Sequence, residues 1–195
     1  KICGATPDAL AALPRASLAR LVEGGVTLLE TLRAFACEQL SAENRLPETR
    51  RIHAAYFASL AGEVFKGILG PEQKSWLTNA RRDHDNFRLA LSFALEQSDS
   101  ALAVSISGGL WWFWNRQGFI REGREWLGKA LALPAPHPLD EAQKRSRATA
   151  LNGVGSICAE LGVFDVAMRY LHQGLALRQE IEDTEGISVV LHNIG

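Results

Sequence analysis

The side chains best suited to metal or acid–base chemistry stand together in the segment RRDHDN, residues 81–86. Asp83, His84 and Asp85 are consecutive, and consecutive side chains on a helix point about 100° apart. They therefore cannot converge on one ion, and the HExxH spacing that puts two histidines on one helix face is absent. We expect Asp83 or Asp85 to stabilise a helix N-terminus here, and we expect no metal site.

Nucleophilic catalysis would need an accessible thiolate or hydroxyl beside a base. Cys37 and Cys158 stand among apolar residues of helical patterns, which favours small core side chains over reactive thiols. No GxSxG motif occurs, and Glu122 and Glu125 alternate with arginine at the spacing of a solvated helix face. The sequence therefore predicts no catalytic residue and no cofactor in this segment, and the protein is expected not to be an enzyme.

Four aromatic residues run together in the stretch GGLWWFWNRQG. On a helix, Trp111 and Trp114 share one face, which should pack in the core against the following segment REWLGKAL. Trp112 points elsewhere. It can pack against the preceding helix around Phe93, or it can face a partner.

Bulk properties narrow the class of protein. The 195 residues carry a net charge of −1, which gives no overall attraction to nucleic acid or to an anionic membrane. Three cysteines without a CxxC pair favour free thiols in a reducing compartment. No signal peptide and no apolar run near the ~20 residues of a membrane span occur. We expect a cytoplasmic protein without membrane contact.

Helical spacing dominates the chain, and only residues 25–30 (GVTLLE) indicate a short strand. Residues 13–25 are predicted to form a short helix. From Thr31 onward the pattern predicts helices only, and Asp99 is the predicted N-cap of the helix that carries the aromatic stretch. Breaks are predicted near residue 81, at the loop PAPHPLD (134–140), at Gly162 and at Gly186.

Two helical segments resemble each other within the chain. Residues 118–133 align with 162–177 at an offset of 44, and residues 151–155 align with 191–195 at an offset of 40. A helix–turn–helix unit of about 40 residues therefore recurs. Such a unit cannot bury its apolar face alone, so stacked units are expected to share a continuous core.

The repeat resembles a tetratricopeptide repeat, whose usual period is 34. Residues of the second unit stand where that pattern places large apolar, glycine, turn and small residues: Leu151, Val154, Gly155, Gly162, Ala167, Leu171 and Leu177. In the first unit Trp111 and Gly123 depart from the pattern, so this unit is a degenerate repeat. The resemblance implies an all-α fold of antiparallel helix hairpins in a right-handed superhelix.

The order of the segments TLLETLRAFACEQL, RRIHAAYFASLA, RRDHDNFRLALSFALEQSD and LWWFWNRQGFIREGREWLGKALAL is similar to large LuxR-type transcriptional regulators. These regulators are STAND (NB-ARC) ATPases, in which a P-loop module precedes a winged-helix domain and a helical repeat array. The resemblance implies a partial winged-helix remnant at 1–30, a helical linker bundle at 31–98 and tetratricopeptide-like repeats at 99–195. The repeats would span about 99–133, 141–183 and, in part, 186–195.

The departures from this family also carry expectations. No GxxxxGK[ST] occurs, so ATP is expected only in an upstream domain. The pattern predicts that the first wing strand is shortened or missing, so DNA binding is not carried over to residues 1–30. The chain lacks an initial Met and ends within a helical pattern, so both ends are expected to be cuts in a longer protein.

In a tetratricopeptide-like array, the first helix of each pair lines a concave groove. The repeat register places further groove positions at Ser105, Gly108, Thr149, Ala159 and Val189. The predicted partner-binding residues are Trp112, Asn115, Arg116, Asn152, Ser156, Glu160 and His192.

The resulting hypothesis is a non-catalytic interaction and effector-sensing module of a cytoplasmic ATP-dependent transcriptional regulator. Its partners would be a protein, a peptide or a small effector, together with other domains of the parent chain. The alternatives are a DNA-contacting winged-helix module and a purely structural or oligomerisation arm.

Overall fold

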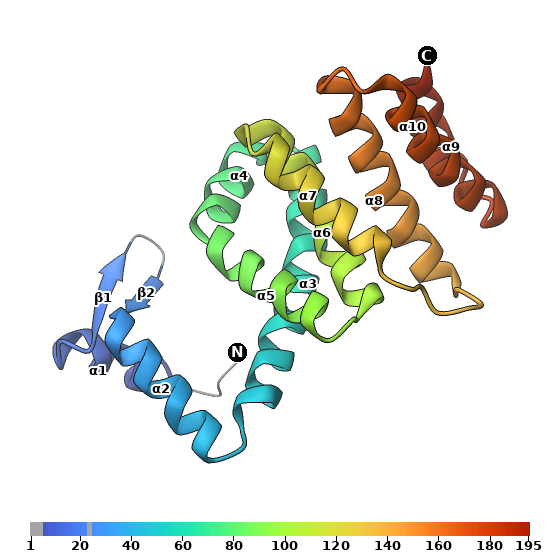
Figure 1. Cartoon of the computed structure of the whole chain (residues 1–195). Coiled ribbons are helices and arrows are strands. Elements are labelled where there is room, and N and C mark those ends of the chain that lie inside the picture. Colours follow the sequence, from blue (N-terminus) through green and yellow to red (C-terminus); the bar gives the residue numbers. More distant parts are fainter. Residues whose placement is uncertain (1–5, 23–24) are drawn as a thin grey trace. The chain divides into compact units, whose positions relative to one another are not determined.

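Helices form nearly all of the regular structure in the computed structural model, which describes residues 6–22 and 25–195 (Figure 1). This confirms the all-α class. The elements are α1 (Pro7–Arg15), β1 (Ala19–Val22), β2 (Gly25–Leu28), α2 (Glu30–Ala42), α3 (Leu46–Leu69), α4 (Gln73–Arg82), α5 (His84–Glu96), α6 (Ser100–Gln117), α7 (Ile120–Ala132), α8 (Glu141–Glu160), α9 (Phe164–Glu180) and α10 (Thr184–Ile194).

The chain divides into two compact units, residues 1–53 and 54–195. The division falls inside α3 and does not coincide with the predicted segment boundaries after residues 30 and 98. Those boundaries follow the resemblance, and they stay predictions.

The first unit contains a β-hairpin where part of a helix was predicted. β1 pairs with β2 in antiparallel register, with Ala19 opposite Leu28. The predicted helix over residues 13–25 is therefore wrong over residues 16–22, where the strand β1 stands, and Gly24, its predicted end, lies outside the described residues. The first strand was expected to be shortened or missing, and β1 has four residues. The physical reason is Ser17, whose φ of 56° is left-handed and cannot continue an α-helix. β2 confirms the predicted short strand.

Helix α2 follows the hairpin and buries none of its residues. Cys37 on α2 is exposed, so the expectation that it is a small core residue is wrong. Its neighbour Phe35 is 57 % exposed. An apolar stripe at helical spacing permits burial, but burial also needs an element packed over the stripe. Cys158 on α8 is fully buried, as the pattern predicted.

Two helix hairpins of the second unit turn in the same way. Gly118, between α6 and α7, has φ 78°, and Gly162, between α8 and α9, has φ 74°. After each glycine a backbone N–H reaches back to close the first helix, from Phe119 to the Trp114 carbonyl and from Val163 to the Cys158 carbonyl. The two glycines that align at an offset of 44 thus have equivalent conformations.

Aspartate opens the first helix of each hairpin. Asp99 Oδ1 accepts from the Leu102 N–H and confirms the predicted cap, while Asp140 and Gln143 form a capping box. Asp183 caps α10 by accepting from the Gly186 N–H. The predicted turn at Gly186 is therefore wrong, because the capped helix begins two residues earlier.

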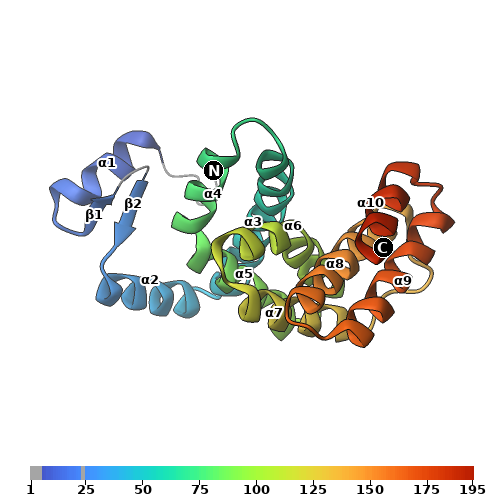
Figure 2. The same cartoon turned by 90° about the horizontal axis from the view of Figure 1, so that it is seen from above.

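Helices α6 to α10 pack on one another in succession, as both views show (Figures 1 and 2). Trp111 and Trp114 are 4 % and 1 % exposed, so their predicted burial is confirmed. Trp114 packs on Gly123 of α7, where an added Cβ would lie 2.9 Å from the Trp114 Cβ. Trp111 packs on Gly153 of α8 instead. The prediction that both tryptophans pack against the segment REWLGKAL of α7 is therefore wrong for Trp111. The glycines give the indole rings room between the helices.

Candidate binding groove

Two adjoining hollows lie on the face made by α3, α6, α8 and α10. The first, here called the aromatic hollow, has a volume of about 360 Å³. Its apolar wall consists of Phe65, Leu69, Trp111, Trp112, Val189 and Val190. Its polar wall consists of Arg145, Thr149, Asn152, Arg178, Asp183 and Glu185.

The second, here called the cationic hollow, has a volume of about 440 Å³. It shares Phe65, Arg145, Thr149, Arg178 and Glu185 with the aromatic hollow. Its other lining residues are Lys66 and a set of small residues, Gly62, Ser105, Gly108, Gly109 and Ser146. Because the two hollows share a wall, they form one groove.

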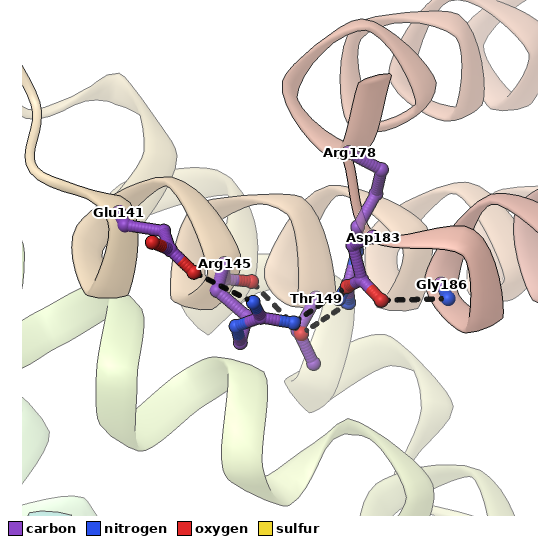
Figure 3. Close-up of polar contacts among 6 residues, drawn as sticks. All are labelled: Glu141, Arg145, Thr149, Arg178, Asp183 and Gly186. Atoms are coloured by element: carbon purple, nitrogen blue, oxygen red, sulfur yellow. Dashed lines mark hydrogen bonds and ion pairs between the residues drawn. The ribbon is translucent and has the colours of Figure 1, made fainter. Parts of the chain in front are cut away.

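A network centred on Asp183 fixes the polar wall (Figure 3). Arg145 Nη1 of α8 lies 2.9 Å from Asp183 Oδ2, and Arg178 of α9 donates to the same oxygen. Arg178 Nη2 also donates to Thr149 Oγ1 at 2.7 Å. Because Asp183 Oδ1 accepts from the Gly186 N–H, one carboxylate ties together α8, α9 and α10.

The Asp183 carboxylate is held in its charged form. Burial acts to raise its pKa, but the hydrogen bonds from the Gly186 backbone and Arg178 and the charges of Arg178 and Arg145 outweigh burial. The pKa of Asp183 therefore lies below its ordinary value. The Asp183 carboxylate therefore keeps its charge at neutral pH.

The aromatic wall presents Trp112 as a half-buried ring. Its ring stacks on Trp111 with centroids 4.6 Å apart and an interplanar angle of 28°. The Arg116 guanidinium lies over the Trp112 ring as well, 4.5 Å from its centroid. Trp112 is thus oriented by neighbours on its own helix and lines the hollow.

The structure brings some of the predicted binding residues together in the groove. Trp112 and Asn152 line the aromatic hollow, and Ser105, Gly108, Thr149 and Val189 also line the groove. Arg116 touches the groove only through its stacking on Trp112.

The remaining predicted residues are not among those that line the groove. Asn115 of α6 donates to Glu160 of α8, so these two side chains are partners of each other. Ser156 Oγ donates to the Asn152 carbonyl oxygen at 2.9 Å. His192 is exposed on α10 and is not among the lining residues.

Sequence reasoning missed the charged groups and the α3 wall. Arg145 and Glu185 lie one helical turn before the predicted positions Thr149 and Val189, so extending the groove register by one turn would have found them. Lys66 precedes the detectable repeats, and no pattern in the sequence placed α3 against them.

A separate, partly buried cluster joins α5 to α7. Glu122 accepts two hydrogen bonds from Arg88, at 2.8 and 2.6 Å, and one from Trp126 Nε1. His84 Nε2 lies 3.1 Å from Glu122 Oε1 but without hydrogen-bond geometry, and its ring packs edge-on against Phe113. His84 of the RRDHDN segment, which is 6 % exposed, therefore lies in the core.

We expect His84 to make the protein less stable in mild acid. Burial holds the pKa of His84 below its ordinary 6.5, and the charge of Arg88 adds to this, although Glu122 and Asp85 oppose it. As pH falls below about 6.5, the unfolded chain takes up the proton first, so the free energy of unfolding decreases towards the folded pKa. Urea unfolding at pH 7.5 and 5.5 should show this loss.

The matched variants are His84→Leu, which removes the buried titrating group, and His172→Leu, which changes an exposed histidine of α9. The dependence on pH should flatten in the first variant and persist in the second. If the free energy of unfolding changes equally with pH in His84→Leu and in the unchanged protein, His84 is not the group that lowers stability in mild acid.

Within residues 6–22 and 25–195, no group of at least three His, Cys, Asp or Glu side chains is arranged to hold a metal ion. In the same residues, no helix is both long enough and apolar enough to cross a bilayer. Comparison of the chain with protein-family models, with curated proteins and with solved structures gives no match.

Proposed function

We propose that the tetratricopeptide-like repeats of residues 99–195 form a non-catalytic interaction module, whose groove, completed by α3, binds a peptide, a protein or a small effector. One observation carries this proposal. The groove is lined by α6, α8 and α10, which the sequence repeat places at equivalent positions, together with α3. Its walls combine a half-buried tryptophan with arginines, a composition typical of binding hot spots.

The local geometry supports the repeat assignment. The hairpins α6–α7 and α8–α9 share the left-handed glycine turn, and the helices that open each unit share an aspartate cap. Stacking further units of this kind would generate the right-handed superhelix of the repeat family.

The proposed setting is a cytoplasmic, LuxR-type STAND regulator, as the order of the helical segments suggested. A ligand in the groove would change the activity of an upstream ATPase only if it bound the two states of the regulator with different affinity. The α8–α9–α10 junction at Asp183 is a suitable place for such a difference, because the groove wall and the packing of three helices meet there.

Replacing Trp112 with alanine tests the groove. The ring is half-buried and stacks on Trp111, so the free energy of unfolding should fall by only about 1 kcal/mol. Peptides selected on the 195-residue chain from a random displayed library should lose at least about tenfold in affinity, because the variant removes an aromatic anchor.

The matched control is Trp126→Ala, which removes a half-buried tryptophan of α7 outside the groove lining. It should leave peptide affinity unchanged. If the selected peptides bind both variants equally well, the groove is not the binding site. Binding of random duplex DNA by the 195-residue chain, in place of peptide binding, would favour the alternative of a DNA-contacting module.

A further inference from the structure

We propose that a small hollow between α6, α8 and the loop that joins α7 to α8 binds a small carboxylate with a short apolar chain (Figure 1). This hollow, here called the loop hollow, shares no lining residue with the aromatic hollow and only Ser146 with the cationic hollow. It is therefore a second site, beyond the proposed function of the groove. An arginine without a counter-charge, a free hydroxyl and an apolar lining of suitable volume support it.

Three segments line the loop hollow: the start of α6, the loop of residues 133–140 and the first two turns of α8. The loop contains Pro134, Pro136 and Pro138, and each proline ring fixes the φ of its own residue. The backbone of this wall therefore has little freedom before a ligand binds. A wall that is already formed keeps the cost of ordering on binding small.

Arg147 brings a positive charge to the loop hollow without a carboxylate partner. Its Nη2 donates to the Leu131 carbonyl oxygen at 3.0 Å, and among the described residues this is its only polar contact. Its other nitrogens are not sealed in the interior, so they can still donate. Burial lowers the pKa of the Arg147 guanidinium, and no neighbouring carboxylate raises it again. A half-buried cation without a counter-charge is costly, so the hollow favours an anion.

Ser100 adds a free hydroxyl from α6. The residue is 6 % exposed and lines the loop hollow. Its Oγ makes no hydrogen bond with the other described residues, and it is not sealed in the interior. The Ser146 hydroxyl of α8 lines the same hollow and is also without a partner among the described residues. Two hydroxyls and a guanidinium thus supply donors for both oxygens of a carboxylate.

The rest of the lining is largely apolar and leaves room for a short chain. Val104, Pro136 and Leu139 contribute to it, together with three alanines, and the volume is about 150 Å³. An apolar cavity of about this volume accommodates a benzene molecule, so a chain of about four to six carbon atoms fits. A phosphate ion would leave the apolar wall in water, whereas an alkyl chain removes it from water.

Among the described residues, Asp140 is the one carboxylate that lines the loop hollow, and it repels an anion. It makes no ion pair with Arg147, because its Oδ1 accepts from the Gln143 N–H and caps α8. The positive end of the helix offsets part of its charge. The inference therefore predicts opposite effects for Arg147 and Asp140, which a loss of folding cannot mimic.

The test is a titration of the isotope-labelled 195-residue chain with pentanoate, followed by NMR. The amide signals of Ser100, Ala101 and Gln143 should shift until they saturate, with a dissociation constant of about 1 mM or lower. Pentanamide has the same chain without the charge and should bind at least about tenfold more weakly. Acetate should bind more weakly than pentanoate, by about fourfold for each methylene removed.

Three variants locate the site. Arg147→Gln should weaken pentanoate binding at least about tenfold, and Asp140→Asn, which keeps an oxygen for the cap, should strengthen it by a few-fold. Ala142→Leu should abolish binding, because the larger side chain fills the hollow. Ala142 is exposed, so this variant should still fold if Arg147→Gln does not.

The matched controls are Arg169→Gln and Ala176→Leu, which change exposed residues of α9 outside the lining. Both should leave pentanoate affinity unchanged. Trp112→Ala should also leave it unchanged, because Trp112 lies in the groove and not in the loop hollow. Failure of the groove and failure of the loop hollow are therefore distinguishable.

Equal affinity for pentanoate and pentanamide would show that the hollow does not recognise a carboxylate. Unchanged pentanoate binding in Ala142→Leu would place the site elsewhere. Signals that never saturate would show that the protein has no such site, and each of these results overturns the inference.

Discussion

Trp114→Ala is expected to lower the free energy of unfolding by about 3–5 kcal/mol, the largest loss among single aromatic truncations of the α6–α7 hairpin. Trp114 is 1 % exposed and fills the space above Gly123. The helices cannot close over the lost ring, because the two-residue turn after α6 fixes their separation. Since small proteins are stable by only about 5–15 kcal/mol, urea unfolding followed by circular dichroism will resolve this loss.

Two matched variants separate packing from hydrogen bonding. Trp114 Nε1 is buried without a partner, so Trp114→Phe removes an unsatisfied donor while keeping most of the ring, and it should cost far less than alanine. Trp126→Ala truncates a half-buried ring on the neighbouring helix and should also cost less. A loss for Trp114→Ala no greater than that for Trp126→Ala would show that the ring is not a core element.

Helical phase explains why the sequence predicted the core of this hairpin. Trp111 and Trp114 are three residues apart, and the geometry of an α-helix alone puts side chains at that spacing on a common face. Asp99 and Gly118 likewise mark the ends of α6, because their side-chain chemistry and backbone freedom suit a cap and a left-handed turn. These features depend on residues close in sequence.

Features that depend on the approach of distant segments were not predictable in this way. Trp111 packs on Gly153 of α8, a contact that follows from the angle between two hairpins. The β1 strand was missed for a local reason instead, because the left-handed backbone of Ser17 ends the helix before it and serine has no strong preference for that conformation. Exposed Cys37 shows the same limit, because its pattern could not say whether another element covers α2.

The residues of the candidate groove also fall into those that the sequence could predict and those that depend on the packing of distant segments. The repeat register placed Trp112, Asn152 and Thr149 on the groove, because the position of a residue within its repeat can be counted along the sequence alone. Lys66 lies on α3, outside the register, and Asp183 lies at a junction whose geometry depends on three helices. The charged part of the groove could therefore be found only from the structure.

Asp183→Ala is expected to lower the free energy of unfolding by about 3 kcal/mol. The side chains of Asp183 and Arg178 are only 9 % and 13 % exposed, and removal of one partner leaves the other buried without a counter-charge. The variant also removes the α10 cap, worth about 1 kcal/mol. Asp183→Asn keeps the cap and should cost less, and Arg145→Gln should cost least because Arg145 is half exposed and can turn to water. Urea unfolding at pH 7 will rank the three variants.

The pH dependence identifies the charge as the cause. Because the folded pKa of Asp183 lies below its ordinary 3.8, the carboxylate stabilises the fold above that value, and this contribution is lost as pH falls towards the folded pKa. The gap in stability between the unchanged protein and Asp183→Asn should therefore narrow between pH 5 and pH 3, and a constant gap would mean that the loss is steric.

Since the same carboxylate holds α10 against α8 and α9, Asp183→Asn should also weaken groove binding at pH 7, even at temperatures where the protein remains folded. Unchanged binding in that variant would show that the position of the Val189 wall does not depend on the Asp183 network.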